Sequence, residues 1–213
     1  MDCQGYTDTR FPYDPRREPV WQAIAGYLRR YTPGARVAVE IGAAYCHLIN
    51  NVNAAERHAV DLSDAIAKYV ASPVVPHVGS CTRLPQFADR TVDVVYASNL
   101  FEHLTSDELS AALTEVRRIL RPGGRLIVIQ PNFKHCYRQY FDDYTHVQVF
   151  TDVSLRDRLL ASSFAIVDVQ PRFLPFSMHS RLPASGPLVA AYLRAPFRPF
   201  AGQMLIVAES PVR

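Results

Sequence analysis

The sequence contains the stretch Val37-Ala38-Val39-Glu40-Ile41-Gly42-Ala43-Ala44-Tyr45-Cys46, which predicts a strand, a turn of small residues and then a helix. In an open α/β sheet the turn after the first strand lies where ligands bind, and small residues such as Gly42 let the backbone approach a ligand closely. Asp61 follows Glu40 by 21 residues, at the end of a second predicted strand. Such folds place there a carboxylate that accepts hydrogen bonds from ribose hydroxyls. Taken alone, the pair fits either a nicotinamide enzyme or a nucleoside-sulfonium enzyme.

Strands and helices alternate along most of the chain. The predicted strands are 37–41, 58–61, 74–78, 92–97, 126–129, 164–169 and 203–208, and the predicted helices are 20–30, 45–56, 106–120 and 151–162. The helix over 106–120 has one apolar face and is ended by Arg121-Pro122-Gly123-Gly124, while Thr151 is a plausible cap for the helix at 151–162. Short apolar strands separated by helices predict an α/β fold with a single, mostly parallel sheet, helices on both faces and a final antiparallel strand.

The length and composition favour one domain. The 213 residues are 48% hydrophobic and 20% charged, which is enough for one packed core. Residues 1–35 are predicted to form an N-terminal arm on a domain that spans 36–213. This domain carries a cap insertion at 131–150 and a Pro-rich segment at 171–200, where six prolines predict little regular structure.

Charge and cysteine content argue against several classes of protein. The net charge of +3 comes from scattered arginines, which is weak support for a nucleic-acid partner. The four cysteines form no close pair of the kind that a zinc or redox site uses, so no metal is predicted. No serine nucleophile elbow and no P-loop occurs. No secretory leader is recognised, and no apolar run reaches the roughly 18–20 residues of a membrane span, so a cytoplasmic location is predicted.

The sequence resembles the class I S-adenosylmethionine-dependent methyltransferases, in particular the bacterial group called type 11. The family pattern of an acidic residue before a three-glycine turn stands here as Glu40, Gly42, Ala44 and Cys46, so only the first glycine is kept. More specific are the later motifs, which read Val92-Asp93-Val94-Val95-Tyr96-Ala97-Ser98-Asn99-Leu100-Phe101-Glu102-His103-Leu104 and Leu120-Arg121-Pro122-Gly123-Gly124-Arg125-Leu126. The resemblance covers residues 36–169 and implies a Rossmann-like fold with S-adenosylmethionine as cofactor.

The resemblance also implies roles for single residues. The methionine end of the cofactor would face Glu40, Gly42 and Ala44; the ribose would face Asp61, with Leu62 as a further cofactor-binding residue. The adenine would face Ser80 and Cys81, and Asn99 and Leu100 would form the floor near the sulfonium. Ala44 and Ser80 depart from the family pattern, which predicts a lower cofactor affinity. Other roles stay open: Glu40 could cap a helix, and Cys46, Cys81 and His103 could be buried packing residues.

The acceptor of the methyl group is predicted to be a small molecule or a glycan. A hydroxyl acceptor would benefit from a base, for which His103, Asp143 and His146 are the candidates, whereas an amine needs none. The insertion at 131–150 mixes aromatic and polar residues, as a polar acceptor requires, and it could alternatively be a structural flap held by Asp143 and His146. The phrases Phe141-Asp142-Asp143-Tyr144-Thr145-His146 and Pro171-Arg172-Phe173-Leu174-Pro175 are similar to methyltransferases of surface-polysaccharide and O-antigen assembly.

Other functions and partners remain as alternatives. A nicotinamide-dependent oxidoreductase would need a Tyr/Lys-type pair, and neither Lys68 nor Lys134 sits in one. A non-catalytic methyltransferase-like binding protein is suggested by Ala44 and Ser80. The segment 171–200 combines apolar residues with arginines, which suits peripheral membrane contact, although packing on the domain or on a second subunit in a homodimer explains the same composition.

Overall fold

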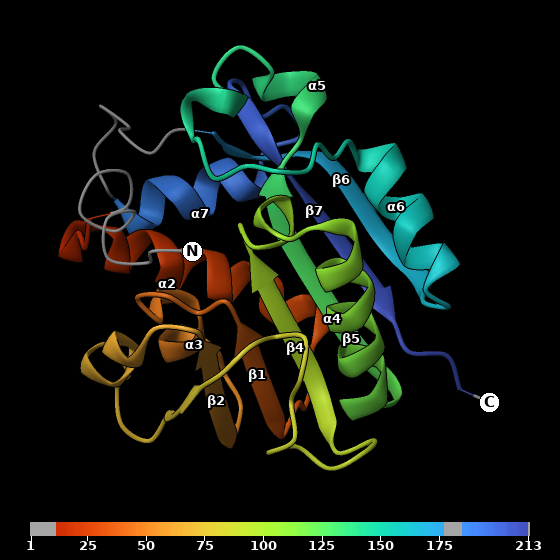
Figure 1. The fold of residues 1–213 in the computed structure, drawn as a ribbon. Coiled ribbons are helices and arrows are strands. Elements are labelled where there is room, and N and C mark those ends of the chain that lie inside the picture. Colours follow the sequence, from red (N-terminus) through yellow and green to blue (C-terminus); the bar gives the residue numbers. More distant parts are fainter. Residues whose placement is uncertain (1–11, 177–184, 213) are drawn as a thin grey trace.

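A computed structural model describes residues 12–176 and 185–212, which form a seven-stranded sheet with helices on both faces (Figure 1). The strand order is β3-β2-β1-β4-β5-β7-β6. The strands are β1 (Val37–Ile41), β2 (Glu56–Asp61), β3 (Val75–Val78), β4 (Val92–Ser98), β5 (Leu120–Pro131), β6 (Ala165–Pro175) and β7 (Ala201–Glu209). All neighbours pair in parallel except β7, which is antiparallel to β5 and β6. The predicted fold class, including the final antiparallel strand, is confirmed.

The helices form two layers. They are α2 (Glu18–Leu28), α3 (His47–Asn51), α4 (Ser106–Ile119), α5 (Phe133–Cys136), α6 (Asp152–Ala161) and α7 (Gly186–Arg194), with single 3-10 turns η1 (Pro15–Arg17), η2 (Arg29–Tyr31), η3 (Asp64–Lys68), η4 (Phe101–His103) and η5 (Tyr140–Asp142). Side chains alternate along a strand, so Val39 packs in the core under α4 and α6, while Ala38 packs in the core under α2, α3 and α7 (Figure 1). Both faces of the sheet are therefore covered.

Helices α4 and α6 begin with matching caps. The Thr105 hydroxyl accepts a hydrogen bond from the Glu108 amide, and the Glu108 carboxylate accepts one from the Thr105 amide. Thr151 and Ser154 form the same reciprocal pair at the start of α6. Each pair satisfies amide groups that would otherwise lack a partner at a helix start. The prediction that Thr151 caps this helix is confirmed.

Two sequence predictions were wrong in extent. The helix predicted over 45–56 is only α3, because the chain stays in the turn until Cys46 and becomes extended at Val52. The segment 171–200 holds more regular structure than its prolines predict. Part of it continues β6, an edge strand that tolerates prolines, and part forms α7, which has a proline in its first turn. Residues 177–184 lie outside the described part.

The N-terminal region contributes to the core under α2, α3 and α7. Trp21, Ile24 and Leu28 on α2 are buried, and α2 contacts both α3 and α7. Residues 1–11 of the predicted arm lie outside the described part. Within the described residues, the helices are all too short or too polar to cross a bilayer.

Candidate active site

The carboxyl ends of the central strands bring the sequence motifs together. Ile41 at the end of β1 pairs with Val60 on one side and with Ala97 on the other. The residues that follow these three positions, including Gly42 and Asp61, therefore lie along one edge of the sheet. Ligands of open α/β sheets bind at this edge.

The turn after β1 keeps the backbone that three glycines would favour. Gly42, Ala44 and Cys46 all have positive φ angles, of 66°, 43° and 58°. A residue with a Cβ pays roughly 1–2 kcal/mol for this left-handed conformation. The Ala44 amide donates a hydrogen bond of 2.8 Å to Oδ2 of Asp61, which helps to hold the strained turn. Ala44 and Cys46 therefore adopt the left-handed backbone that glycine would favour at their positions.

Glu40 is a buried acid beneath this turn. Its side chain is 3% exposed, and Oε2 accepts a hydrogen bond of 3.0 Å from the Ile49 amide in α3. Burial raises the pKa of Glu40 to about 8, and the nearby charge of Asp61 adds to the rise. The helix-capping role that the sequence left open is thus present. A cofactor ammonium group brought near this carboxyl would favour its ionised form.

The surroundings of Asp61 fit a nucleoside. Its Oδ1 accepts from the Ser63 amide at 2.9 Å, and the carboxylate keeps partial exposure to solvent. Leu62 beside it is 63% exposed, so a carboxylate stands next to an open apolar surface. A ribose needs such a carboxylate as a hydrogen-bond acceptor, and a flat base can lie on the apolar surface. Ser80 bonds to Thr82 at 2.8 Å, and Cys81 is buried with its thiol pKa raised to about 11 by that burial.

Asn99 and Leu100 border the same turn from β4. Asn99 has a positive φ of 49°, and its Oδ1 accepts a hydrogen bond of 2.7 Å from Nε2 of Gln203 in β7. The Leu100 side chain lies directly on Gly42, because a Cβ added to Gly42 would stand 2.7 Å from Leu100 Cδ1. Gly42 is therefore required by close packing as well as by its φ angle. Sequence reasoning missed Gln203, which lies more than 100 residues from its partner in the chain.

The insertion after β5 is tied to the segment that follows β4. It contains α5 and η5 and lies beyond the carboxyl end of β5 (Figure 1). The amides of Val147 and Gln148 donate hydrogen bonds of 2.9 and 3.1 Å to the Glu102 carbonyl, and Gln148 Nε2 donates to the Leu104 carbonyl. The insertion and η4 therefore form one hydrogen-bonded unit. That this unit caps an acceptor site stays a prediction.

The three candidate bases meet inside that unit. Nδ1 of His103 lies 2.9 Å from the hydroxyl of Thr145, and this hydroxyl lies 2.6 Å from Oδ1 of Asp143. Because the carboxylate can only accept, the hydroxyl donates to Asp143 and accepts from His103, which places the histidine proton on Nδ1. The His146 ring is edge-on to His103, with centroids 4.9 Å apart, and its Nε2 lies 3.8 Å from Oδ2 of Asp143.

Burial weakens His103 as a base. The pKa of His103 is lowered to about 4 by desolvation and, to a smaller extent, by His146. Asp143 and His146 are each 9% exposed and already engaged within the unit. The arrangement therefore orients a neutral imidazole but gives it little power to deprotonate a hydroxyl.

Two buried side chains at this edge have no partner for any of their polar atoms. They are Glu102, which is 1% exposed, and Gln130, which is fully buried near the end of β5. Burial raises the pKa of Glu102 to about 8. Orphaned buried groups of this kind are uncommon in proteins and call for an explanation. Sequence analysis quoted Glu102 within a motif but assigned it no role, and it did not single out Gln130.

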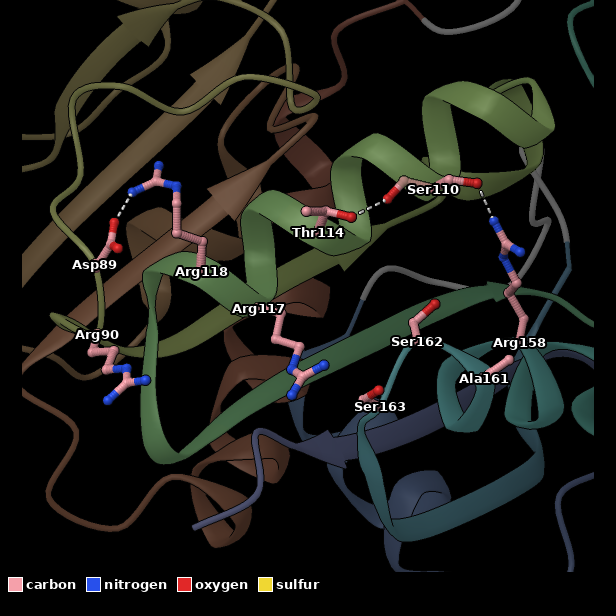
Figure 2. A pocket seen from close by; sticks show the side chains of 10 residues that line it. All are labelled: Asp89, Arg90, Ser110, Thr114, Arg117, Arg118, Arg158, Ala161, Ser162 and Ser163. Atoms are coloured by element: carbon pink, nitrogen blue, oxygen red, sulfur yellow. Dashed lines mark hydrogen bonds and ion pairs between the residues drawn. The ribbon is translucent and has the colours of Figure 1, made fainter. Parts of the chain in front are cut away.

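An open hollow of about 530 Å³ lies away from this edge, between α4 and α6 (Figure 2). It is lined by Asp89, Arg90, Ser110, Thr114, Arg117, Arg118, Arg158, Ala161, Ser162 and Ser163. Arg90 precedes β4, at the opposite end of that strand from Asn99. The hollow contains none of the candidate site residues, and its arginines make it basic.

Comparison with known proteins finds similarity to methyltransferases. A family model described as a methyltransferase domain matches residues 37–128. Malonyl-[acyl-carrier protein] O-methyltransferase 1 of Coxiella burnetii is 33% identical over 122 residues, which cover 54% of this chain and 42% of the relative. The enzyme of the same name from Methylococcus capsulatus is 28% identical over 176 residues, covering 75% and 62%. The chain thus spans about half the length of these relatives.

Solved structures show the same fold. A SAM-dependent methyltransferase of Thermotoga maritima superposes with a TM-score of 0.69 at 17% identity, covering 97% of this chain and 93% of its own. Geranyl diphosphate methyltransferase in complex with SAM gives 0.65 at 16% identity, covering 93% and 92%. The chain therefore has the Rossmann-like class I methyltransferase fold, and its residues 37–128 match a methyltransferase domain. Of the functions that the sequence left open, the domain match supports the methyltransferase.

Proposed function

We propose that this chain transfers a methyl group from S-adenosylmethionine to the carboxylate of an acyl group held on a carrier protein. Relatives that match over half or more of the chain are named malonyl-[acyl-carrier protein] O-methyltransferases. The chain spans only part of their length, so the match suggests the acceptor class and does not identify it. The chemistry of the candidate bases is a second, independent support.

The weak base at the site favours an acceptor that is already ionised. A carboxylate carries its negative charge at neutral pH and attacks through a lone pair without prior loss of a proton. A hydroxyl would need a base, and the pKa of His103, lowered to about 4 by burial, makes this residue a poor one. The hydrogen bond that already ties Nδ1 of His103 to Thr145, together with this lowered pKa, is the observation that most favours a carboxylate over a hydroxyl.

Basic residues at the insertion would assist such an acceptor. Lys134, His135 and Arg172 lie close together: the pKa of His135 is lowered first by burial and then by the charges of Arg172 and Lys134. Asp152 offsets part of this charge through a 2.9 Å ion pair with Lys134. A cluster with excess positive charge attracts an acyl carboxylate and an acidic carrier surface.

The residues at the sheet edge would divide the work. Bound S-adenosylmethionine supplies a methyl group activated by its sulfonium charge. Asp61 would hold the ribose hydroxyls, Glu40 would lie near the methionine ammonium, and the Gly42 turn would let the chain approach closely. The insertion would exclude water and hold the acceptor in line, which is the main requirement of this reaction.

Purified protein incubated with S-adenosylmethionine and a panel of acceptors tests the proposal. The panel contains malonyl-loaded carrier protein, the unloaded carrier protein, free malonate and a hydroxyl-bearing oligosaccharide, and products are identified by mass spectrometry. We expect methylation of the loaded carrier only, as an alkali-labile ester. Methylation of the oligosaccharide alone would refute the proposal and would support the glycan acceptor predicted from the sequence.

The candidate bases give a second test. With a carboxylate acceptor, His103→Gln, Asp143→Asn and His146→Ala should each keep turnover within about tenfold of the wild type, because no proton has to be removed. A base would instead cost about 100-fold or more on removal. Cofactor affinity measured by calorimetry on each variant separates loss of chemistry from loss of folding.

A further inference from the structure

We propose that Glu102, His103 and His146 form a binding site for a divalent transition metal ion of the zinc type. One ligand atom from each side chain lies within 4.8 Å of the other two. Among the described residues, this is the group of three His, Cys, Asp or Glu side chains whose ligand atoms come close enough to share an ion. Two imidazoles with one carboxylate is a ligand set found in catalytic zinc sites, which keep a further position open.

Glu102 supplies the observation that points to a bound cation. Both carboxylate oxygens are buried and lack any hydrogen-bond partner, and the residue is 1% exposed. Besides the two histidines and its own backbone amide, its surroundings include the Asp143 carboxylate, the Cys136 thiol and the Tyr140 ring, and none of these three carries a positive charge. Buried carboxylates are normally paired or bound to a metal. A divalent ion would supply the missing partner.

Both histidines are held in the orientation that metal ligands require. Nδ1 of His146 lies 2.6 Å from the Tyr140 carbonyl, which can only accept, so the ring donates from Nδ1. Nδ1 of His103 donates to Thr145, which in turn donates to Asp143. Metal-binding histidines almost always donate their second ring nitrogen to a carbonyl or carboxylate in this way. The metal would be bound through Nε2 of each ring.

The geometry needs only small movements of side chains. Zinc bound at about 2.0–2.1 Å to each ligand places tetrahedral ligand atoms about 3.3 Å apart, so ligand atoms that now lie within 4.8 Å of one another have to close by at most roughly 1.5 Å. Oδ2 of Asp143 lies 3.8 Å from Nε2 of His146 and adds negative charge beside the ion.

The test measures metal binding without cofactor or acceptor. Full-length protein, freed of any affinity tag and stripped with a chelator, is titrated with Zn²⁺ by calorimetry and with Co²⁺ by visible absorption. We expect one ion per chain in the wild type. Glu102→Gln, which is nearly isosteric and removes no side-chain hydrogen bond seen in the structure, should weaken binding by more than the roughly 10–100-fold cost of losing an outer partner. Thr145→Val should weaken it by about 10–100-fold.

His77→Ala is the matched control. Nε2 of His77 on β3 lies 3.0 Å from Nδ1 of His58 on β2, away from the proposed site. This pair of histidines could bind zinc adventitiously. Its loss should leave the affinity unchanged. The proposal is overturned if stripped wild-type protein binds no zinc, if Glu102→Gln binds as tightly, or if His77→Ala abolishes binding. Because no methyl transfer is measured, failure of the proposed acceptor would leave these outcomes unaffected.

Discussion

Replacement of Glu40 by Gln should stabilise the protein at neutral pH, and the gain should grow with pH. The pKa of Glu40 is raised from 4.5 to about 8 by its burial. Between these two values the unfolded chain loses the proton of Glu40 while the folded chain retains it. The folded state therefore binds more protons there, and its stability falls as pH rises through that window. Below about pH 4.5 both states are protonated, and above about pH 8 the loss is complete.

The size of the effect follows from the two pKa values. They differ by about 3.5, and each unit corresponds to about 1.36 kcal/mol, so Glu40 costs on the order of 5 kcal/mol above pH 8. A glutamine amide has no proton to lose in this range. Its carbonyl oxygen can still accept the hydrogen bond from the Ile49 amide. Any fixed cost of the amide group is independent of pH and does not alter the trend.

Urea unfolding at pH 5, 6, 7 and 8, followed by fluorescence of the buried Trp21, measures this trend. The free energy of unfolding of Glu40→Gln minus that of the wild type should rise by several kcal/mol from pH 5 to pH 8. Taking this difference cancels all other titrating groups. Glu56→Gln, which removes an exposed carboxyl paired with Arg36, is the matched control variant. A flat difference for Glu40→Gln would refute the reasoning.

The other predictions concern the turn and its carboxylate. Asp61→Ala should weaken S-adenosylhomocysteine binding by about 1.5–3 kcal/mol in calorimetry, the loss expected for charge-assisted hydrogen bonds, and Asp64→Ala should not. Unchanged affinity of folded Asp61→Ala would contradict the assigned ribose role. Ala44→Gly should raise the free energy of unfolding by about 0.5–1 kcal/mol, because relief of the left-handed strain exceeds the greater unfolded-state entropy of glycine. Asp61→Ala should lower the free energy of unfolding more in the wild-type background than in the Ala44→Gly background. Equal losses in this double-mutant cycle would show that Asp61 does not hold the turn.

The fold could be predicted from the sequence because its signals are local. The short apolar run at 92–97 and the single apolar face of 106–120 depend on neighbouring residues, and both predicted elements are present as β4 and α4. The errors arose where tertiary position overrides local preference. Prolines at 171–175 are tolerated because β6 forms the edge of the sheet, a position that composition does not reveal.

The candidate site could be predicted only where its residues lie at the ends of strands that are neighbours in the sheet. Glu40, Asp61 and Asn99 each come at or just after a strand end, so parallel pairing brings them to one edge. The contact of His103 with Thr145 joins residues 42 positions apart, and it depends on how an irregular insertion folds back. No periodic pattern specifies such a contact, so the histidine cluster was foreseen as separate candidates and not as a ligand set.

Structural and functional roles for the acids at this edge need not exclude each other. An ionised carboxylate offers about four acceptor positions. The hydrogen bonds described here use two of these positions on Asp61, for the Ala44 and Ser63 amides. Asp61 can therefore shape the turn and still accept from a ribose, because its fixed backbone bonds orient the remaining lone pairs. The strained turn with Ala44 and Cys46 is tolerable for the same reason. The Asp61 carboxylate that would bind the cofactor also holds the backbone of this turn through the Ala44 amide.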